Sequence, residues 1–126
     1  MKNEFEIKVC KKCGAMVEVL KDCTCEGCGI KCCGEEMVTM KANSVDASVE
    51  KHLPTYEVIG TYIVATVNHV MEDDHYIEYI ALDSDRINAK KYLKPGEMAK
   101  AVFPYVPNSK LYAYCNKHGM WSTDVK

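Results

Sequence analysis

The sequence lacks several features that would assign it to a broad class of proteins. Its net charge is only -2 and its pI is near 6.1, so it has no excess of basic side chains to favour nucleic acid or a membrane surface as a partner. No apolar run approaches the ~20 residues that a membrane-spanning helix needs. The first residues, MKNEFEIKVC, contain no apolar signal region. We therefore expect a cytoplasmic protein that is neither exported nor bound to a membrane.

A sustained helical period is also missing. Instead, the second half of the chain contains short runs that are rich in β-branched and aromatic residues, as strands are. These runs lie at residues 55–59, 61–67, 76–82, 99–103 and 110–115. Short strands at this spacing are typical of an antiparallel β-sandwich. The predicted fold class is therefore all-β.

The eight cysteines are distributed unevenly: seven lie between residues 10 and 33, and Cys115 lies near the C-terminus. This division predicts a thiol-rich domain at 1–40, a linker at 41–49, and a sandwich domain at 50–126 that holds every histidine. In a reducing cytoplasm, so many cysteines favour metal or redox chemistry over disulfides. The thiol-rich head is too short to build a stable core unaided, so we expect a metal or dimerisation to hold it.

Cys10 and Cys13 form a CxxC knuckle, a turn that directs two sulfurs at one ion. A tetrahedral site needs a second pair of ligands. The candidates are Cys25 with Cys28, Cys28 with Cys32, and Cys32 with Cys33. Spacing favours the first pair, which is usual in a zinc ribbon, because adjacent side chains diverge in an extended chain. Tetrahedral thiolate sites suit zinc and iron alike, so the residues alone leave the metal open.

The histidines of the second domain all flank strand-like runs, where loops can converge at one end of a sandwich. They are His52, His69, His75 and His118. Cys115 lies three residues before His118, which makes a local chelate. Several neutral imidazoles together with one thiolate suit a redox-active iron or copper.

Longer motifs extend these patterns over nearly the whole chain. They are CxxCG at 10–14, VEVL at 17–20, CCGEEM at 32–37, EKHLP at 50–54, NHVMEDDHYIEYI at 68–80, KPGE at 94–97 and YCNKHGMW at 114–121. In this order they resemble the desulfoferrodoxin family, the two-iron superoxide reductases of anaerobes. The head resembles desulforedoxin, and the body resembles the neelaredoxin-type catalytic domain. This resemblance implies a small metal-stabilised domain followed by an immunoglobulin-like β-sandwich.

The resemblance also implies two iron ions per chain. The ligands of a four-thiolate iron in the head would be Cys10, Cys13, Cys32 and Cys33. The ligands of the catalytic iron would be four imidazoles and an axial thiolate, namely His52, His69, His75, His118 and Cys115. Glu50 and Lys51 match the loop that the family places beside the open coordination position.

The implied activity is one-electron reduction of superoxide to hydrogen peroxide, without release of dioxygen, as a detoxification reaction in an anaerobe or microaerophile. Lys51 would attract superoxide and orient a water, and Glu50 would occupy the open position in the oxidised state. The head iron would store or relay electrons. The expected partners are a rubredoxin-like electron donor and a second copy of the chain in a homodimer.

One segment departs from the family pattern. The stretch between Cys13 and Cys32 is longer than in desulforedoxin, and it carries Cys23, Cys25 and Cys28. These three could be free thiols, an oxidisable pair or an alternative ligand set. The competing functions are a non-enzymatic zinc-ribbon protein, a superoxide dismutase or peroxide-handling enzyme, and a one-iron reductase without the head iron.

Overall fold

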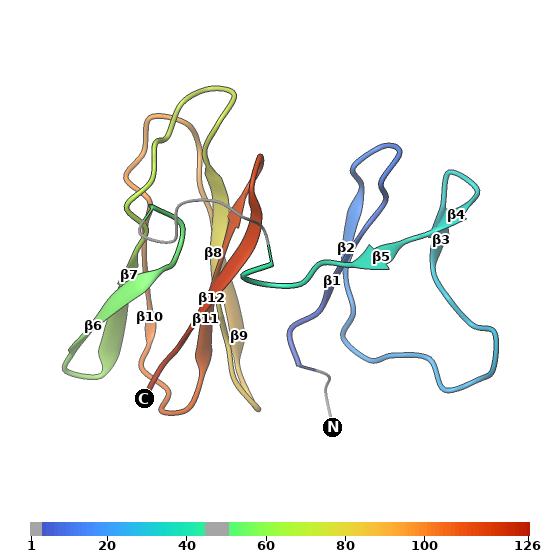
Figure 1. The fold of residues 1–126 in the computed structure, drawn as a ribbon. Coiled ribbons are helices and arrows are strands. Elements are labelled where there is room, and N and C mark those ends of the chain that lie inside the picture. The colour runs from blue at the N-terminus through green and yellow to red at the C-terminus, as the bar shows by residue number, and fades with distance from the viewer. Residues whose placement is uncertain (1–3, 45–50) are drawn as a thin grey trace. The chain divides into compact units, whose positions relative to one another are not determined.

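The computed structural model describes residues 4–44 and 51–126, and Figure 1 shows how their strands are arranged. In this part of the chain, the twelve regular elements are all β-strands. They belong to two compact units that divide between Lys41 and Ala42. Among the described residues, no helix has the length and apolar character needed to cross a membrane. The all-β prediction is confirmed.

The N-terminal unit consists of a three-stranded antiparallel sheet, ordered β2-β1-β5, and a separate hairpin of β3 and β4. Its strands are β1 (Ile7–Val9), β2 (Met16–Glu18), β3 (Lys31–Cys32), β4 (Glu35–Glu36) and β5 (Val38–Thr39). The strand expected at 17–20 is β2, and it ends at Glu18. The buried apolar side chains described in this unit are Phe5, Ile7, Cys10, Val19 and Met37. So small a core needs further support, as its length predicts.

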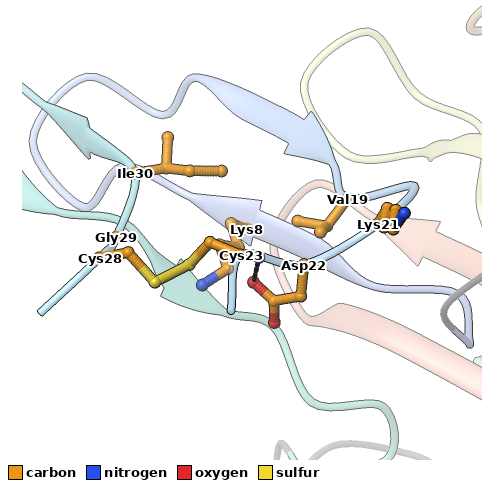
Figure 2. A pocket seen from close by; sticks show the side chains of 8 residues that line it. All are labelled: Lys8, Val19, Lys21, Asp22, Cys23, Cys28, Gly29 and Ile30. Atoms are coloured by element: carbon orange, nitrogen blue, oxygen red, sulfur yellow. Dashed lines mark hydrogen bonds between the residues drawn. A yellow bond between two sulfur atoms is a disulfide. The ribbon is translucent and has the colours of Figure 1, made fainter. Parts of the chain in front are cut away.

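A long loop joins β2 to β3 and contains the three cysteines that depart from the family pattern. Cys23 and Cys28 are joined there by a disulfide with a sulfur–sulfur distance of 2.03 Å (Figure 2). Cys25, between them, is an exposed free thiol. Gly27 has a φ of 68°, a conformation that glycine adopts without strain. The turn at this glycine lets the next residue, Cys28, reach Cys23.

The C-terminal unit is a sandwich of two antiparallel sheets, with strand orders β10-β7-β6 and β12-β11-β8-β9. The strands are β6 (Thr55–Ile59), β7 (Tyr62–Thr66), β8 (Ile77–Asp83), β9 (Asn88–Tyr92), β10 (Lys100–Pro104), β11 (Lys110–Cys115) and β12 (Gly119–Asp124). Each run expected from the sequence corresponds to one of these strands, within one residue at either end. The architecture is the predicted immunoglobulin-like sandwich.

The sandwich core follows from the period of two along each strand. In β10, Ala101 and Phe103 are buried while Val102 is exposed. In β11, the same alternation places Leu111, Ala113 and Cys115 in the core cluster, and it ends on the thiol. The last inward position of this strand therefore carries a thiol in place of an aliphatic side chain.

Beside this thiol, the pairing of β8 with β11 contains a bulge. Cys115 pairs with Ile77, but Tyr114 pairs with Tyr79, so Glu78 is an extra residue on β8. A bulge shifts the alternation by one position, and Ile77 and Ile80 both enter the core. The irregularity lies at the end of the strand that faces the cluster described below.

Two strands of the sandwich were not expected from the sequence. β9 has the sequence NAKKY, which has little of the usual strand composition, and it forms the edge next to β8. Lysines on an edge strand discourage pairing with other chains. β12 begins at Gly119, directly after the last histidine, and pairs with β11 from Cys115↔Gly119 onward.

Part of the segment expected to be a linker, residues 41–49, lies against the sandwich. The backbone N–H of Asn43 donates to the Met120 carbonyl at 2.9 Å, and its side-chain oxygen accepts from the Ser122 N–H at 2.9 Å. Residues 45–49 lie outside the described residues.

Two candidate metal centres

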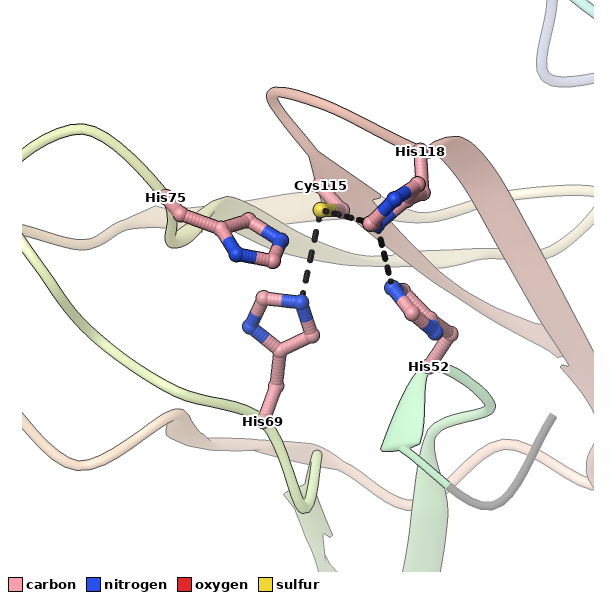
Figure 3. Close-up of side chains that lie close together, drawn as sticks. All are labelled: His52, His69, His75, Cys115 and His118. Carbon is pink, nitrogen blue, oxygen red and sulfur yellow. Dashed lines mark hydrogen bonds between the residues drawn. The ribbon is translucent and has the colours of Figure 1, made fainter. Parts of the chain in front are cut away.

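Four imidazoles and one thiol converge at one end of the sandwich (Figure 3). They are His52, His69, His75, Cys115 and His118, and their ligand atoms all lie within 4.8 Å of one another. His52 precedes β6, His69 follows β7, His75 precedes β8 and His118 lies in the β11–β12 turn. Since neighbouring strands are antiparallel, these five positions share one end of the fold. All the histidines that the sequence singled out are thus brought together.

The turn between β11 and β12 places the thiol and one imidazole side by side. Cys115 Sγ lies 3.7 Å from His118 Nδ1. Gly119 closes the turn with a φ of 79°, which a residue with a Cβ rarely adopts. The three-residue spacing in the sequence therefore becomes a local chelate because glycine lets the chain reverse immediately after the histidine.

His69 is oriented by its own neighbour. Its Nδ1 lies 2.6 Å from the Val70 carbonyl oxygen, which can only accept, so Nδ1 carries the proton. The lone pair is left on Nε2, which lies 3.4 Å from Cys115 Sγ. A histidine that donates one ring N–H to a carbonyl while offering the other nitrogen is the usual arrangement of a metal ligand.

Trp121 holds the two imidazoles on the other side of the cluster. Its ring stacks on that of His52, with centroids 4.9 Å apart and an angle of 25° between the planes. Its Nε1–H donates to the His118 carbonyl at 3.2 Å. His52 Nε2 and His118 Nδ1 then lie 3.0 Å apart, so one nitrogen must carry a proton when no cation lies between them.

The most informative atom of the cluster is Nε2 of His75. It is fully buried, and among the described residues it has no hydrogen-bond partner. Leaving a buried polar atom unpaired costs free energy, of the order of 1–3 kcal/mol. In Figure 3, the ring of His75 points toward the other four side chains. A metal ion among these donors would satisfy the nitrogen, so the donor set fits a cation.

Burial also prepares the imidazoles for binding a cation. It lowers the pKa of His69 and of His75 below the ordinary value of 6.5, and the neighbouring histidines lower both further. Both rings are therefore neutral near pH 7, with a lone pair available. Neutral imidazoles with one thiolate are ligands that suit iron or copper.

Asn116 connects two parts of this site and was missed in the sequence. Its side-chain oxygen accepts from the Tyr76 N–H at 3.0 Å, and its Nδ2 donates to the Asp74 carbonyl at 3.0 Å. These bonds tie the loop of His75 to the residue that follows Cys115. Asparagine often makes such bonds to loop backbone, but its partner is 40 residues away in the sequence and only the fold reveals it.

The loop pair expected beside the cluster is only partly described. Lys51 is exposed and directly precedes the buried His52. Glu50 lies outside the described residues.

The N-terminal unit brings four thiols together. Cys10, Cys13, Cys32 and Cys33 have their sulfurs within 4.8 Å of one another, and the Cys13–Cys32 and Cys32–Cys33 pairs are 3.6 and 3.9 Å apart. A tetrahedral metal with bonds of ~2.3 Å to four sulfurs needs sulfur–sulfur distances of roughly 3.8 Å. The cluster therefore has the size of a four-thiolate metal site.

Adjacent cysteines can share this site because the chain turns between them. Cys32 pairs with Glu35, so Cys33 and Gly34 form a two-residue hairpin turn. Their φ values are 54° and 78°, and positive φ at both central positions is the property of a type I′ turn. The divergence expected of adjacent side chains applies to an extended chain, and Cys33 is not extended.

Contacts within the cluster oppose the ionisation of Cys32 and Cys33. The Cys13 N–H lowers the pKa of the Cys10 thiol to about 7. Contact with the Cys13 thiol raises the pKa of Cys32 to about 12, and it also raises that of Cys33. Like charges at this distance disfavour one another, and a metal ion removes that penalty.

The other two pairs considered from the sequence do not join the knuckle. Cys28 is bonded to Cys23, so neither the pair with Cys25 nor the pair with Cys32 is available in this structure. Among the options open for the three extra cysteines, the structure contains an oxidised pair and one free thiol.

Comparison with known proteins agrees with the fold. The sequence model of the desulfoferrodoxin family matches residues 44–124. Desulfoferrodoxin from Nitratidesulfovibrio vulgaris is 40% identical over 130 residues, which covers 99% of this chain and 100% of that protein. Desulfoferrodoxin from Syntrophotalea carbinolica is 37% identical over 129 residues, covering 98% and 99%.

Among solved structures, the superoxide reductase from Treponema pallidum has the same fold. It superposes with a TM-score of 0.71 at 23% identity, covering 97% of this chain and 99% of that one. The family match spans most of the sandwich, and the curated relatives align over both units. The chain therefore belongs to the desulfoferrodoxin family.

Proposed function

We propose that this chain is a superoxide reductase, which reduces superoxide to hydrogen peroxide without forming dioxygen. The observation that carries the proposal is the convergence of four imidazoles and one thiol around an unpartnered His75 Nε2, in a chain of the desulfoferrodoxin family. Each turnover consumes one superoxide, one electron and two protons, and releases one hydrogen peroxide.

The ligands that we propose for iron at this site are His52, His69, His75, Cys115 and His118. When bound, iron supplies the one-electron redox chemistry. The neutral imidazoles leave most of the cation's positive charge uncompensated, because Cys115 is the only anionic group among the five ligands. A small anion such as superoxide is attracted to such a site.

The segment before β6 carries the groups that we propose to handle the substrate. Lys51 is exposed next to the buried His52, so its ammonium group adds to the positive potential at the entrance. It is also suited to orient a water that delivers a proton to the departing peroxide. For Glu50 we propose the role of a carboxylate that covers the site after the product has left.

For the head we propose a second iron held by Cys10, Cys13, Cys32 and Cys33, which stores or relays electrons. The size of the cluster and the close approach of its four thiols support a four-thiolate metal. The electron donor that we propose is a rubredoxin-like protein. We further propose a cytoplasmic homodimer, with domains at 1–40 and 50–126 joined by a linker.

The decisive test combines metal analysis with product stoichiometry. The purified chain is supplied with superoxide and a reductant, and hydrogen peroxide and dioxygen are measured together. Reduction yields one peroxide per superoxide and no dioxygen, whereas dismutation yields half as much peroxide and releases dioxygen without a reductant. Dioxygen evolution, or a colourless protein that contains only zinc, would refute the proposal.

A further inference from the structure

A third cysteine site lies outside both clusters. Cys23 and Cys28 are bonded to each other, and Cys25 between them is a free thiol. In the described part of the chain, none of these residues belongs to either metal-ligand group. The proposed superoxide chemistry gives them no role.

The position of the disulfide argues against a purely structural bridge. Cys23 and Cys28 are separated by only five positions and belong to the same loop between β2 and β3. The stabilisation from a cross-link grows with the length of chain that it closes. This bond closes a short loop, so it adds little to the stability of the folded state. It joins no strand to another, and both sulfurs belong to a segment that is largely exposed.

The disulfide also borders an open cavity of about 620 Å³ (Figure 2). Lys8 and Lys21 also line this cavity, and the Lys8 ammonium lies 3.9 Å from the Glu6 carboxylate. The thiolate is the form of a cysteine that reacts with peroxides and disulfides, and the open cavity gives small reagents access to this pair. Asp22, the acidic residue of the lining, accepts the Cys23 N–H at 2.9 Å.

We propose that Cys23 and Cys28 form a dithiol–disulfide couple that reduces hydrogen peroxide to water. The proposal rests on the proposed function only for the source of the peroxide, which is the product of superoxide reduction. The same chain would then carry superoxide through to water in two separate sites.

The step balances as follows. In the reduced chain, the Cys23 thiolate attacks one oxygen of hydrogen peroxide, so that an S–O bond forms, the O–O bond breaks and the other oxygen leaves as water. Cys28 then attacks the Cys23 sulfur, which forms the disulfide and releases a second water. A small dithiol reductant returns two electrons and two protons by thiol–disulfide exchange. Cys23 is assigned the attack because it is exposed and Cys28 is half-buried.

The chain offers a matched pair of variants for the test. Cys25→Ser removes the third thiol of the loop but keeps the couple, and Cys25→Ser with Cys28→Ser differs from it only in the resolving thiol. Each full-length variant is reduced with dithiothreitol, desalted and treated with one equivalent of hydrogen peroxide. Alkylation and peptide mapping then identify the linked cysteines, and peroxide consumption is followed with dithiothreitol present.

With Cys25→Ser, we expect a Cys23–Cys28 linked peptide and steady consumption of peroxide. With the double variant, we expect consumption to fall at least about tenfold and dimedone to label a sulfenic acid at Cys23, because no second thiol can resolve it. Equal consumption by both variants, or the absence of the linked peptide after peroxide, would overturn the proposal. Superoxide reduction is measured on the same samples, so that a failure of either activity is seen separately.

Discussion

At the scale of single residues, two donor atoms of the histidine–cysteine cluster are shielded from water. The side chain of Cys115 has 0% of its surface exposed, and Nε2 of His75 is buried without a partner among the described residues. A thiolate in such surroundings needs a cation to stabilise its charge. Replacement of one donor atom therefore changes the chemistry more than it changes the packing.

The first prediction concerns Cys115→Ser. Serine has nearly the same shape, so the sandwich should fold, but the thiolate is lost. The iron-loaded variant should lack the thiolate-to-iron absorption of the body site. It should also reduce superoxide at least roughly 10–100-fold more slowly, because altering a group that merely hydrogen-bonds to a ligand already costs that much. Visible spectroscopy and stopped-flow kinetics measure both effects, and Cys25→Ser serves as the control. An unchanged spectrum would show that Cys115 is not a ligand.

The second prediction concerns the cation beside the site. Lys51→Ala should lower the second-order rate constant for superoxide by several-fold, up to about tenfold, because a positive charge at the entrance attracts the anion. The dependence of that rate on ionic strength should also weaken. Lys110→Ala makes the same change in net charge at the far end of β11 from Cys115. Equal rate constants in the two variants would remove the steering role from Lys51.

The third prediction concerns pH and the metal-free chain. Burial keeps the folded-state pKa of His75 below its ordinary value of 6.5, so the unfolded chain binds more protons as the pH falls through that range. Stability is therefore highest above about pH 6.5 and is lost progressively below it. The melting temperature of the metal-free protein should fall between about pH 7 and about pH 5, and His75→Gln should flatten that fall. An identical pH slope in the variant would contradict this account.

At the scale of elements, β8 and β11 position the site. Their inward residues form the centre of the sandwich, and the bulge at Glu78 lets β8 begin with Ile77 opposite Cys115. The position of the thiol therefore depends on the packing of strands whose other residues carry no chemistry.

The fourth prediction tests that packing. Ile80 has 0% of its surface exposed in the middle of β8, so Ile80→Ala should lower the free energy of unfolding of the sandwich by about 2–5 kcal/mol. Val102, with 57% of its surface exposed on β10, is the matched β-branched control, and Val102→Ala should change stability by no more than about 0.5 kcal/mol. Denaturant titration measures both. Similar losses in the two variants would show that the core is not centred on β8.

At the scale of the whole molecule, the two units differ in what stabilises them. The sandwich has a continuous apolar core, whereas the N-terminal unit has few buried side chains and a four-thiol cluster. A small domain with four thiols in contact is expected to rely on its metal for folding, since metal binding then supplies folding free energy.

The fifth prediction follows from this difference. Removal of metal with a chelator should abolish amide hydrogen-exchange protection in β1 and β2 while β8 and β11 remain protected, as measured by mass spectrometry. Cys13→Ser should produce the same loss in the head at full body-iron content. Simultaneous loss of protection in both units would show that one cooperative core holds them.

Much of this architecture could be predicted from the order of residues alone. Runs rich in β-branched and aromatic residues located five strands of the sandwich, because such side chains pack well on a pleated, half-buried surface. The histidines and cysteines that converge were identified by residue type and by motif. The fold was needed to show that the loops carrying these residues lie at the same end of the sandwich.

Other features could not be read from the sequence, because they depend on partners distant along the chain. β9 is a strand because β8 offers it a free edge, and Asn116 acts through a loop 40 residues away. The three extra cysteines looked alike in sequence. The path of one loop decided that Cys23 meets Cys28 and leaves Cys25 free. The sequence by itself determined which donor atoms this protein has; tertiary structure decided which of them meet, because distance in space is set by packing and not by spacing along the chain.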